Sequence, residues 1–270
     1  MKVPFLDLRV KNEKLRKKLL ARVNNVLTGG KILEGKEQKI FEKKFAKKLN
    51  AKYAVGVSSG SSALFLAIKA LGIGRGDEVI TTPFTWIITV NAISSAGAQP
   101  IFVDVDENLN IDPEQIAAAI TKKTKAIIPM HVGGKLCDME KIYKIAKNYK
   151  LKIIEDAAQA FCSSFKNKRA GAYSDVSAFS FNPMKTLHGY GEAGAVITNN
   201  KRIYNILLQM RHAGTARKTE SIDINNCNYI SLNHKIDTIQ ASMLIENLKR
   251  INKIKKKRDQ ISNYYNKNLK

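Results

Sequence analysis

Short apolar runs alternate along the chain with longer segments in which apolar residues recur every three or four positions. The short runs include YAVGV at 53–57, KIIED at 152–156 and AVIT at 195–198, and runs of this length that stop abruptly are typical of buried parallel strands. The longer segments, such as 138–150, predict amphipathic helices. Because strands and helices alternate at this spacing, the pattern predicts an α/β fold with a mostly parallel, doubly wound sheet flanked by helices.

The two ends of the chain follow the helical pattern. Charged and apolar residues alternate at helical spacing from Lys11 to Leu49, and the glycines within this block divide it into two helices. Beyond Thr198, the segment 201–214 predicts a helix, the polar segment 215–230 predicts a loop, and 231–270 predicts one long helix.

Basic residues strongly outnumber acidic ones, with 46 Lys and Arg against 23 Asp and Glu, a formal net charge of +23. Such a balance is typical of proteins that bind nucleic acid or anionic surfaces. Most of the excess is lysine on helical faces, as in KRINKIKKKR at 249–258, and no zinc-finger spacing or aromatic RNA-binding signature accompanies it. We therefore favour solvated lysine faces over a nucleic-acid surface.

The cysteines and the hydropathy indicate a cytoplasmic protein. Cys137, Cys162 and Cys227 are widely spaced and form no CxxC pair, so we expect no disulfide framework and a reducing compartment. The first residues lack the apolar run of a signal peptide, and no segment approaches the about 18 apolar residues that a membrane-spanning helix needs.

An acid and a lysine follow apolar runs in the centre of the chain. The run at 152–156 ends on Asp156, and a second run is followed by Lys185 and a glycine-rich turn. Strand ends of this kind meet at the ligand-binding rim of an α/β sheet. A lysine amine can hold a cofactor aldehyde as a Schiff base, and a carboxylate can keep a pyridine nitrogen protonated, so the pair predicts pyridoxal phosphate chemistry. Taken singly, Lys185 is more typical of a surface lysine, and Asp156 is more typical of an ordinary strand-end aspartate.

Other residues are candidates to hold such a cofactor. Ser180 lies five positions before Lys185, where its hydroxyl could bind a phosphate. The segment SSGSSAL at 58–64 opens a helix directly after a strand, which predicts an anion site, although an ordinary N-cap by one of its serines is the alternative. Trp86 follows a strand end and could stack on a pyridine ring or pack in the core.

EDAAQA at 155–160, SAFSFNPMK at 177–185 and GEAGAVIT at 191–198 resemble the DegT/StrS-type sugar aminotransferases, a branch of the fold-type-I pyridoxal phosphate enzymes. The resemblance extends from Phe5 to Tyr265. It implies pyridoxal 5'-phosphate as the cofactor. The residues that it assigns to catalysis and to the cofactor are Lys185, for the Schiff base; Asp156, at the ring nitrogen; Gln159, near the cofactor hydroxyl; Trp86, on the ring face; and Gly60, Ser61 and Ser180, at the phosphate.

The resemblance also implies a homodimer with shared active sites, in which Asn233 reaches the phosphate site of the other subunit; alone, Asn233 is also typical of a helix N-cap. A dehydratase branch of the family has histidine in place of the lysine, so Lys185 indicates transamination. The chain departs from the family at Thr186, where asparagine is usual, and at Lys235, where arginine is usual. Lysine cannot reproduce the bidentate fork of arginine.

The resemblance predicts three parts, an N-terminal helical segment at 1–50, a large cofactor-binding α/β domain at 51–235, and the start of a C-terminal subdomain at 236–270. Relatives continue further, so we expect a chain that is truncated at its C-terminus and impaired in catalysis.

The resemblance implies transfer of an amino group, from L-glutamate, to a 3- or 4-keto-6-deoxy sugar nucleotide in the biosynthesis of amino sugars and surface polysaccharides. We expect no membrane or nucleic-acid partner. Two alternatives stay open, a basic anion- or nucleic-acid-binding protein that has lost catalysis and a fold-type-I enzyme that acts on a small amino acid.

Overall fold

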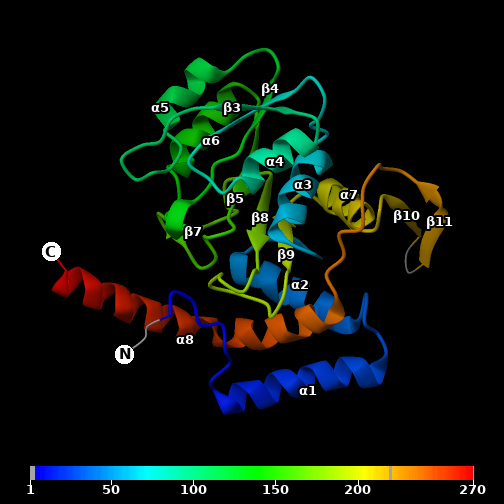
Figure 1. The fold of residues 1–270 in the computed structure, drawn as a ribbon. Helices are drawn as coiled ribbons and strands as arrows, with labels where there is room; N and C mark the ends of the chain where they lie inside the picture. The colour runs from blue at the N-terminus through cyan, green and yellow to red at the C-terminus, as the bar shows by residue number, and fades with distance from the viewer. Residues whose placement is uncertain (1–3, 219–220, 270) are drawn as a thin grey trace.

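A seven-stranded sheet forms the centre of the computed structural model, which describes residues 4–218 and 221–269 and leaves the side chains of 217, 218 and 221–225 undescribed (Figure 1). The strand order is β1-β9-β8-β5-β4-β2-β3. The strands are β1 (Tyr53–Val57), β2 (Glu78–Thr81), β3 (Gln99–Phe102), β4 (Thr124–Ile127), β5 (Lys152–Asp156), β8 (Val176–Ser180) and β9 (Gly194–Thr198).

Most neighbouring strands of this sheet are parallel, which confirms the predicted fold class. Strand β9 is the exception, because it runs antiparallel to both β1 and β8. Parallel neighbours need a long crossover, usually a helix. The connection between β8 and β9, residues 181–193, contains no helix and stays at one rim of the sheet, so β9 returns in the opposite direction.

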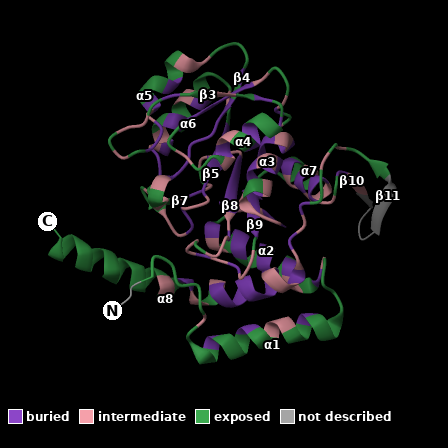
Figure 2. Ribbon diagram, viewed as in Figure 1, coloured by how far each residue is buried: buried purple, intermediate pink, exposed green. Residues whose placement is uncertain are grey.

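Helices cover both faces of the sheet. One face packs against α3, α4 and α7 through side chains such as Leu64, Ile93 and Leu207. The other face packs against α2, α6 and α8, and Figure 2 shows the buried residues concentrated between these layers. The helices are α1 (Glu13–Gly29), α2 (Lys36–Leu49), α3 (Gly60–Ala70), α4 (Ile88–Ser95), α5 (Pro113–Ile116), α6 (Met139–Asn148), α7 (Lys201–Arg211) and α8 (Thr238–Asn268), with short 3₁₀ turns η1 (Ala117–Ala119) and η2 (Val132–Gly134).

The lysine-rich helix α2 is held on the sheet by an aromatic cluster. The rings of Phe41 and Phe45 lie 5.4 Å and 5.1 Å, centroid to centroid, from the ring of Phe181, and both arrangements are edge-to-face. All three rings are fully buried. The apolar stripe of α2 therefore faces the core while its lysines remain solvated, as the helical spacing predicts.

Two predictions near the C-terminal part are wrong. The segment predicted as a loop contains an antiparallel hairpin of β10 (Thr215–Lys218) and β11 (Ser221–Cys227). The ladder joins backbone groups, so polar side chains do not prevent it. The long helix begins at Thr238, seven residues later than predicted, because the Asp237 side chain accepts a hydrogen bond from the Gln240 amide and caps α8 there.

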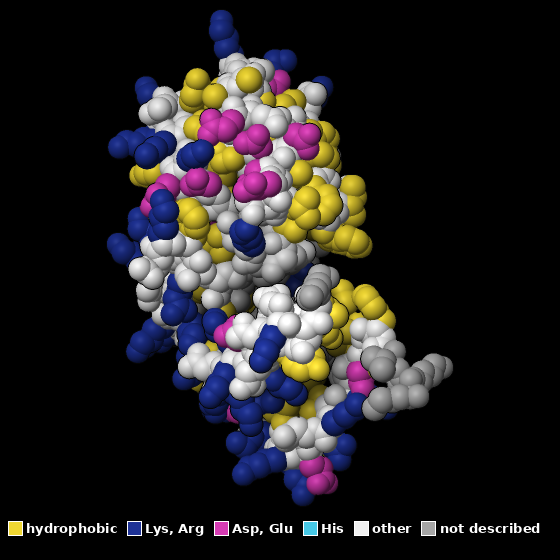
Figure 3. Space-filling model, turned by 90° about the vertical axis from the view of Figure 1, so that its left-hand side faces the viewer, with side chains coloured by type: hydrophobic (Ala, Val, Ile, Leu, Met, Phe, Trp, Pro, Cys, Tyr) yellow, Lys and Arg dark blue, Asp and Glu magenta, His cyan; other side chains and the backbone are white. Residues whose placement is uncertain are grey.

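Charged side chains are unevenly distributed over the surface. Lys and Arg side chains gather over the lower part of the molecule, where Figure 1 places α1 and α8, and Asp and Glu gather higher up (Figure 3). Within residues 4–218 and 221–269, no helix is long and apolar enough to cross a membrane. Cys137, Cys162 and Cys227 are free thiols. The described residues also contain no His, Cys, Asp or Glu cluster suited to a metal ion.

Candidate active site

The predicted site residues meet at the rim formed by the carboxyl ends of the parallel strands. Asp156 is the last residue of β5, which pairs in parallel with β8, and Ser180 is the last residue of β8. The sequence predicted Lys185 at a strand end. It lies instead five residues beyond the end of β8, in the loop that leads to β9. The positive charge of Lys185 nevertheless acts on the carboxyl of Asp156, so the loop returns the lysine to this rim.

The carboxyl of Asp156 is buried and hydrogen-bonded, with only 4% of the residue exposed. Its Oδ2 accepts a hydrogen bond of 2.7 Å from the Thr89 hydroxyl, and its Oδ1 accepts one of 3.1 Å from the Ala158 amide. Burial raises the pKa of Asp156, while these hydrogen bonds and the charge of Lys185 oppose that rise. The carboxyl can therefore respond strongly to a cationic ring nitrogen placed beside it.

Thr89 is a site residue that the sequence analysis missed. Its hydroxyl bridges Asp156 and the hydroxyl of Thr85, which lies 2.7 Å away. Thr85 and Thr89 are four positions apart, on either side of Trp86. This spacing was the only signal in the sequence that could have pointed to Thr89 as a site residue.

A buried pair lies behind Asp156. The Nε2 of His131 lies 3.0 Å from the Oε2 of Glu155, and the same oxygen accepts a hydrogen bond from the Gly171 amide. The Cys137 amide donates to the other ring nitrogen of His131, which leaves the ring proton on Nε2, facing Glu155. The pair thus ties the loop after β4 to β5, and it supports Asp156 rather than facing a ligand.

Lys185 offers a free amine in a half-buried position. Its backbone amide donates to the carbonyl of Asn182, and its own carbonyl lies 3.2 Å from the Nδ1 of His188, so the loop holds the residue at both sides. Among the residues that the structure describes, nothing hydrogen-bonds or pairs with its Nζ. The amine is available to a carbonyl compound.

The N-terminus of α3 forms a cradle beside Ser180. The Ser59 hydroxyl accepts a hydrogen bond from the Ser62 amide, so the N-cap interpretation is confirmed for Ser59. A Cβ atom on Gly60 would lie 2.7 Å from the Cβ of Ser180, which shows how closely β8 approaches this turn. Ser61 is exposed next to it. The free amides and the dipole at the N-terminus of α3 therefore lie next to the hydroxyl of Ser180, an arrangement that suits a phosphate.

The other predicted residues lie around this centre. Trp86 is 70% exposed, so its interpretation as a core residue is wrong. The side-chain oxygen of Gln159 accepts a hydrogen bond of 2.8 Å from the Gly133 amide and fixes η2. Asn233 is exposed before α8, and since Asp237 caps that helix, the N-cap interpretation of Asn233 is wrong. In the described part of the chain, no hydrogen bond joins Asn233 to the other predicted residues.

These groups match the parts of pyridoxal 5'-phosphate one by one. The free amine of Lys185 suits its aldehyde, the buried carboxyl of Asp156 suits its ring nitrogen, and the cradle at Gly60 and Ser180 suits its phosphate. The exposed indole of Trp86 is available for the face of a planar ring.

Comparison with known proteins agrees with this geometry. Residues 13–270 match the DegT/DnrJ/EryC1/StrS aminotransferase family. The chain is 40% identical over 269 residues to the dTDP-3-amino-3,6-dideoxy-alpha-D-galactopyranose transaminase of Aneurinibacillus thermoaerophilus, covering 99% of this chain and 72% of that protein.

Two solved structures share the fold. A DegT DnrJ EryC1 StrS aminotransferase from Brucella abortus superposes with a TM-score of 0.92 at 33% identity, over 98% of this chain and 72% of that one. NtdA from Bacillus subtilis, with bound cofactor PMP, superposes with a TM-score of 0.87 at 35% identity, over 93% of this chain and 56% of that one. The chain thus spans between 56% and 72% of the lengths of these three proteins. It belongs to the DegT/DnrJ/EryC1/StrS aminotransferase family, whose cofactor is pyridoxal 5'-phosphate.

Proposed function

We propose that this protein is an aminotransferase that moves an amino group from L-glutamate to a keto-sugar nucleotide. The observation that carries the proposal is the free amine of Lys185 at the same rim as the buried carboxyl of Asp156. The transaminase from Aneurinibacillus thermoaerophilus, by its name, acts on a dTDP-linked amino sugar, which supports a sugar nucleotide as the substrate class.

Two residues carry the chemistry in this proposal. Pyridoxal phosphate, when bound, supplies the electron sink. The Nζ of Lys185 would take the proton from the α-carbon of the amino donor as general base and would then return a proton as general acid. The carboxyl of Asp156 holds a proton on the ring nitrogen, and Thr89 orients that carboxyl.

The remaining residues bind and orient. Gly60, Ser61 and Ser180 hold the phosphate, and Trp86 covers one face of the ring. Asn233 is exposed, and we assign it to the phosphate site of a second subunit, as the family resemblance implies, so the proposed active form is a homodimer. Gln159 contacts the cofactor hydroxyl while it anchors Gly133.

The test is covalent labelling of the lysine. The protein is reconstituted with pyridoxal phosphate, reduced with borohydride and digested, and the labelled peptide is identified. We expect the label on Lys185 and its loss in Lys185→Ala. Lys123→Ala is the matched control, because Lys123 lies before β4, at the opposite end of the sheet, and should leave labelling unchanged. Equal labelling of Lys185→Ala would exclude the proposed role.

A second measurement tests the reaction. Glutamate should convert the bound cofactor to its pyridoxamine form, and the keto-sugar nucleotide that reverses the conversion identifies the acceptor. A panel with keto groups at C3 and C4 separates the two regiochemistries. Conversion by a small amino acid with no reversal by any keto-sugar nucleotide would favour an enzyme of amino acid metabolism instead.

A further inference from the structure

A network of hydroxyls and one imidazole joins the turn that opens α3 to a distant part of the chain. The Ser62 hydroxyl is at its centre, 2.8 Å from the Ser58 hydroxyl and 3.0 Å from the Nδ1 of His234. It also accepts a hydrogen bond of 3.2 Å from the Ser59 hydroxyl. The three serines belong to the turn that forms the phosphate cradle, whereas His234 lies 172 positions after Ser62, in the segment before α8.

His234 holds the same turn through its backbone. Its carbonyl accepts a hydrogen bond of 2.9 Å from the Ser58 amide, and its own amide donates to the Arg211 carbonyl at 3.0 Å. The residue is buried, and its ring lies 5.6 Å, centroid to centroid, from the ring of Phe65 on α3. The backbone and the side chain of this one residue therefore both act on the start of α3.

We propose that His234 is a positioning residue for the phosphate group of the cofactor and that it acts through Ser62. The identity of the ligand rests on the proposed function, whereas the network itself does not. Within the described residues, the ring of His234 hydrogen-bonds to Ser62 alone, so its influence on the cradle passes through that hydroxyl.

The network decides which groups of the turn remain free for a ligand. The Ser59 hydroxyl accepts a hydrogen bond from the Ser62 amide and donates one to the Ser62 hydroxyl, so these two residues clamp each other. The first amides of a helix have no partner inside the helix. Because the Ser62 amide is engaged, the amides of Gly60 and Ser61 are left to an anion. A rigid turn keeps them aimed at it without a cost of reorganisation.

Packing alone does not explain a histidine at this position. Its Nε2 is buried and, among the residues that the structure describes, has no hydrogen-bond partner. A buried polar atom without a partner destabilises the folded protein, and a phenylalanine of similar shape would avoid that cost. What the imidazole adds is the contact between its Nδ1 and the Ser62 hydroxyl.

The imidazole also sets the direction of the hydrogen bonds. Burial lowers the pKa of His234, so its ring is neutral at pH 7 and has one donor and one acceptor nitrogen. When Nδ1 accepts the single hydroxyl proton of Ser62, the Ser58 hydroxyl donates to Ser62. When Nδ1 donates to Ser62, the proton of Ser62 goes to Ser58. In both tautomers the hydroxyls of Ser58, Ser59 and Ser62 are all engaged, which holds the turn in one conformation.

The experiment compares pyridoxal phosphate with pyridoxal, which lacks the phosphate, in fluorescence titrations of the cofactor-free protein. His234→Phe keeps a ring against Phe65 but removes the contact with Ser62. We expect it to weaken binding of pyridoxal phosphate by about fivefold and binding of pyridoxal by less than about twofold. His234→Asn places an amide near the position of Nδ1 and should recover part of the loss.

A double variant tests the route through Ser62. If His234 acts through this hydroxyl, His234→Phe/Ser62→Ala should bind pyridoxal phosphate no more weakly than Ser62→Ala alone, because the two losses are not additive. Additive losses would overturn the proposed route.

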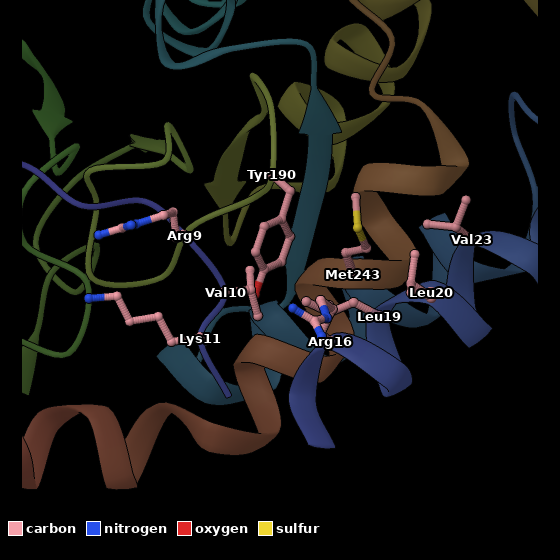
Figure 4. Close-up of a pocket in the computed structure, with 9 residues that line it drawn as sticks. All are labelled: Arg9, Val10, Lys11, Arg16, Leu19, Leu20, Val23, Tyr190 and Met243. Carbon is pink, nitrogen blue, oxygen red and sulfur yellow. The ribbon is translucent and has the colours of Figure 1, made fainter. Parts of the chain in front are cut away.

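A matched control separates positioning from stability. Leu19 is buried in a groove of about 570 Å³ between α1 and α8, where Figure 4 shows it near Met243, and no residue of the network lines this groove. Leu19→Ala should lower the melting temperature but leave the ratio of the two affinities unchanged. Equal losses for pyridoxal phosphate and pyridoxal in His234→Phe would show a merely structural role and overturn the inference, as would no loss for either.

Folding and the proposed function are followed separately. Melting curves of the cofactor-free proteins show whether each variant is folded, and Ser62→Ala supplies the same comparison if His234→Phe is not. Borohydride labelling of Lys185 reports on the proposed function alone. A wild-type protein without that label would overturn the function, and inorganic phosphate, titrated into wild type and His234→Phe, would still test the cradle. A labelled protein whose His234→Phe variant keeps its preference for the phosphate compound would overturn only the inference.

Discussion

Asp156 combines two demands that oppose each other. In the proposed function, the side chain has to be ionised to hold a proton on the ring nitrogen of the cofactor. It is also buried, and burial raises the pKa of Asp156, which favours the neutral form. The hydroxyl of Thr89 and the amide of Ala158 offset part of the cost of the charge. The ligand-free protein therefore carries a local destabilisation that a bound cation would relieve.

This residue gives a prediction about pH. The folded-state pKa of Asp156 is raised, so the unfolded chain loses this proton first as pH increases, and the wild-type protein loses stability between the ordinary pKa of aspartate, about 3.9, and the raised value. Asp156→Asn is neutral throughout. We expect the cofactor-free variant to melt at a higher temperature than wild type at pH 7, and the difference to vanish below about pH 4.

Melting curves across this range test the prediction, with Asp104→Asn, which removes an exposed carboxyl, as the control for net charge. A difference of the same size at pH 4 and pH 7 would contradict it. The variant should also bind pyridoxal phosphate more weakly, because it lacks the partner of the ring nitrogen.

At the scale of elements, the cradle depends on a close approach between β9 and the N-terminus of α3. A Cβ atom on Gly194, the first residue of β9, would lie 2.3 Å from the Ser59 carbonyl oxygen and 2.8 Å from the Gly60 nitrogen. These are backbone atoms and cannot rotate away. Only glycine allows the strand to pass under the helix at this point.

Gly194→Ala should therefore push α3 away from Ser180. We expect a loss of about 1–3 kcal/mol in the free energy of unfolding and a larger loss of affinity for pyridoxal phosphate. Gly29→Ala is the matched control, since Gly29 ends α1 with no atom within 4 Å of a new Cβ, and it should be neutral or slightly stabilising. Chemical denaturation and cofactor titration measure both effects, and equal behaviour of the two variants would refute the argument.

At the scale of the whole molecule, one buried ion pair joins α2, β1 and α7. The Oε1 of Glu42 lies 2.6 Å from Arg211 and also accepts a hydrogen bond of 2.8 Å from the Gly56 amide. The arginine in turn donates to the Gly56 carbonyl. The contact therefore connects the N-terminal helices to the edge of the sheet.

Removing one member should leave a buried, unpaired charge. We expect Glu42→Ala to lower the free energy of unfolding by about 3–5 kcal/mol, and Glu42→Ala/Arg211→Met to recover part of that loss. The exposed pair of Lys141 and Glu114 provides the control, because Glu114→Ala should cost less than about 1 kcal/mol. Urea denaturation of the four proteins checks this, and a small effect of Glu42→Ala would show that water compensates the arginine.

Local patterns were sufficient to predict most elements and the main chemical groups. The apolar run at 53–57 followed by small residues predicted the strand β1 and the helix α3, and the run that stops at Asp156 predicted β5. Such signals depend on residues a few positions apart. The hairpin of β10 and β11 was missed because its stability comes from paired backbones, which leave little trace in side-chain pattern.

Motif and spacing therefore determined the fold class and the family, and they pointed to Asp156 and Lys185 as the candidate site residues. Only the tertiary structure decided which groups surround them. Thr89 reaches Asp156 from 67 positions away, and Arg258 lines an open pocket beside Lys185 from an element whose sequence predicts only a lysine-rich helix. The physical reason is that strand order and the path of residues 181–193 set these distances, and neither is encoded in the local periodicity of the chain.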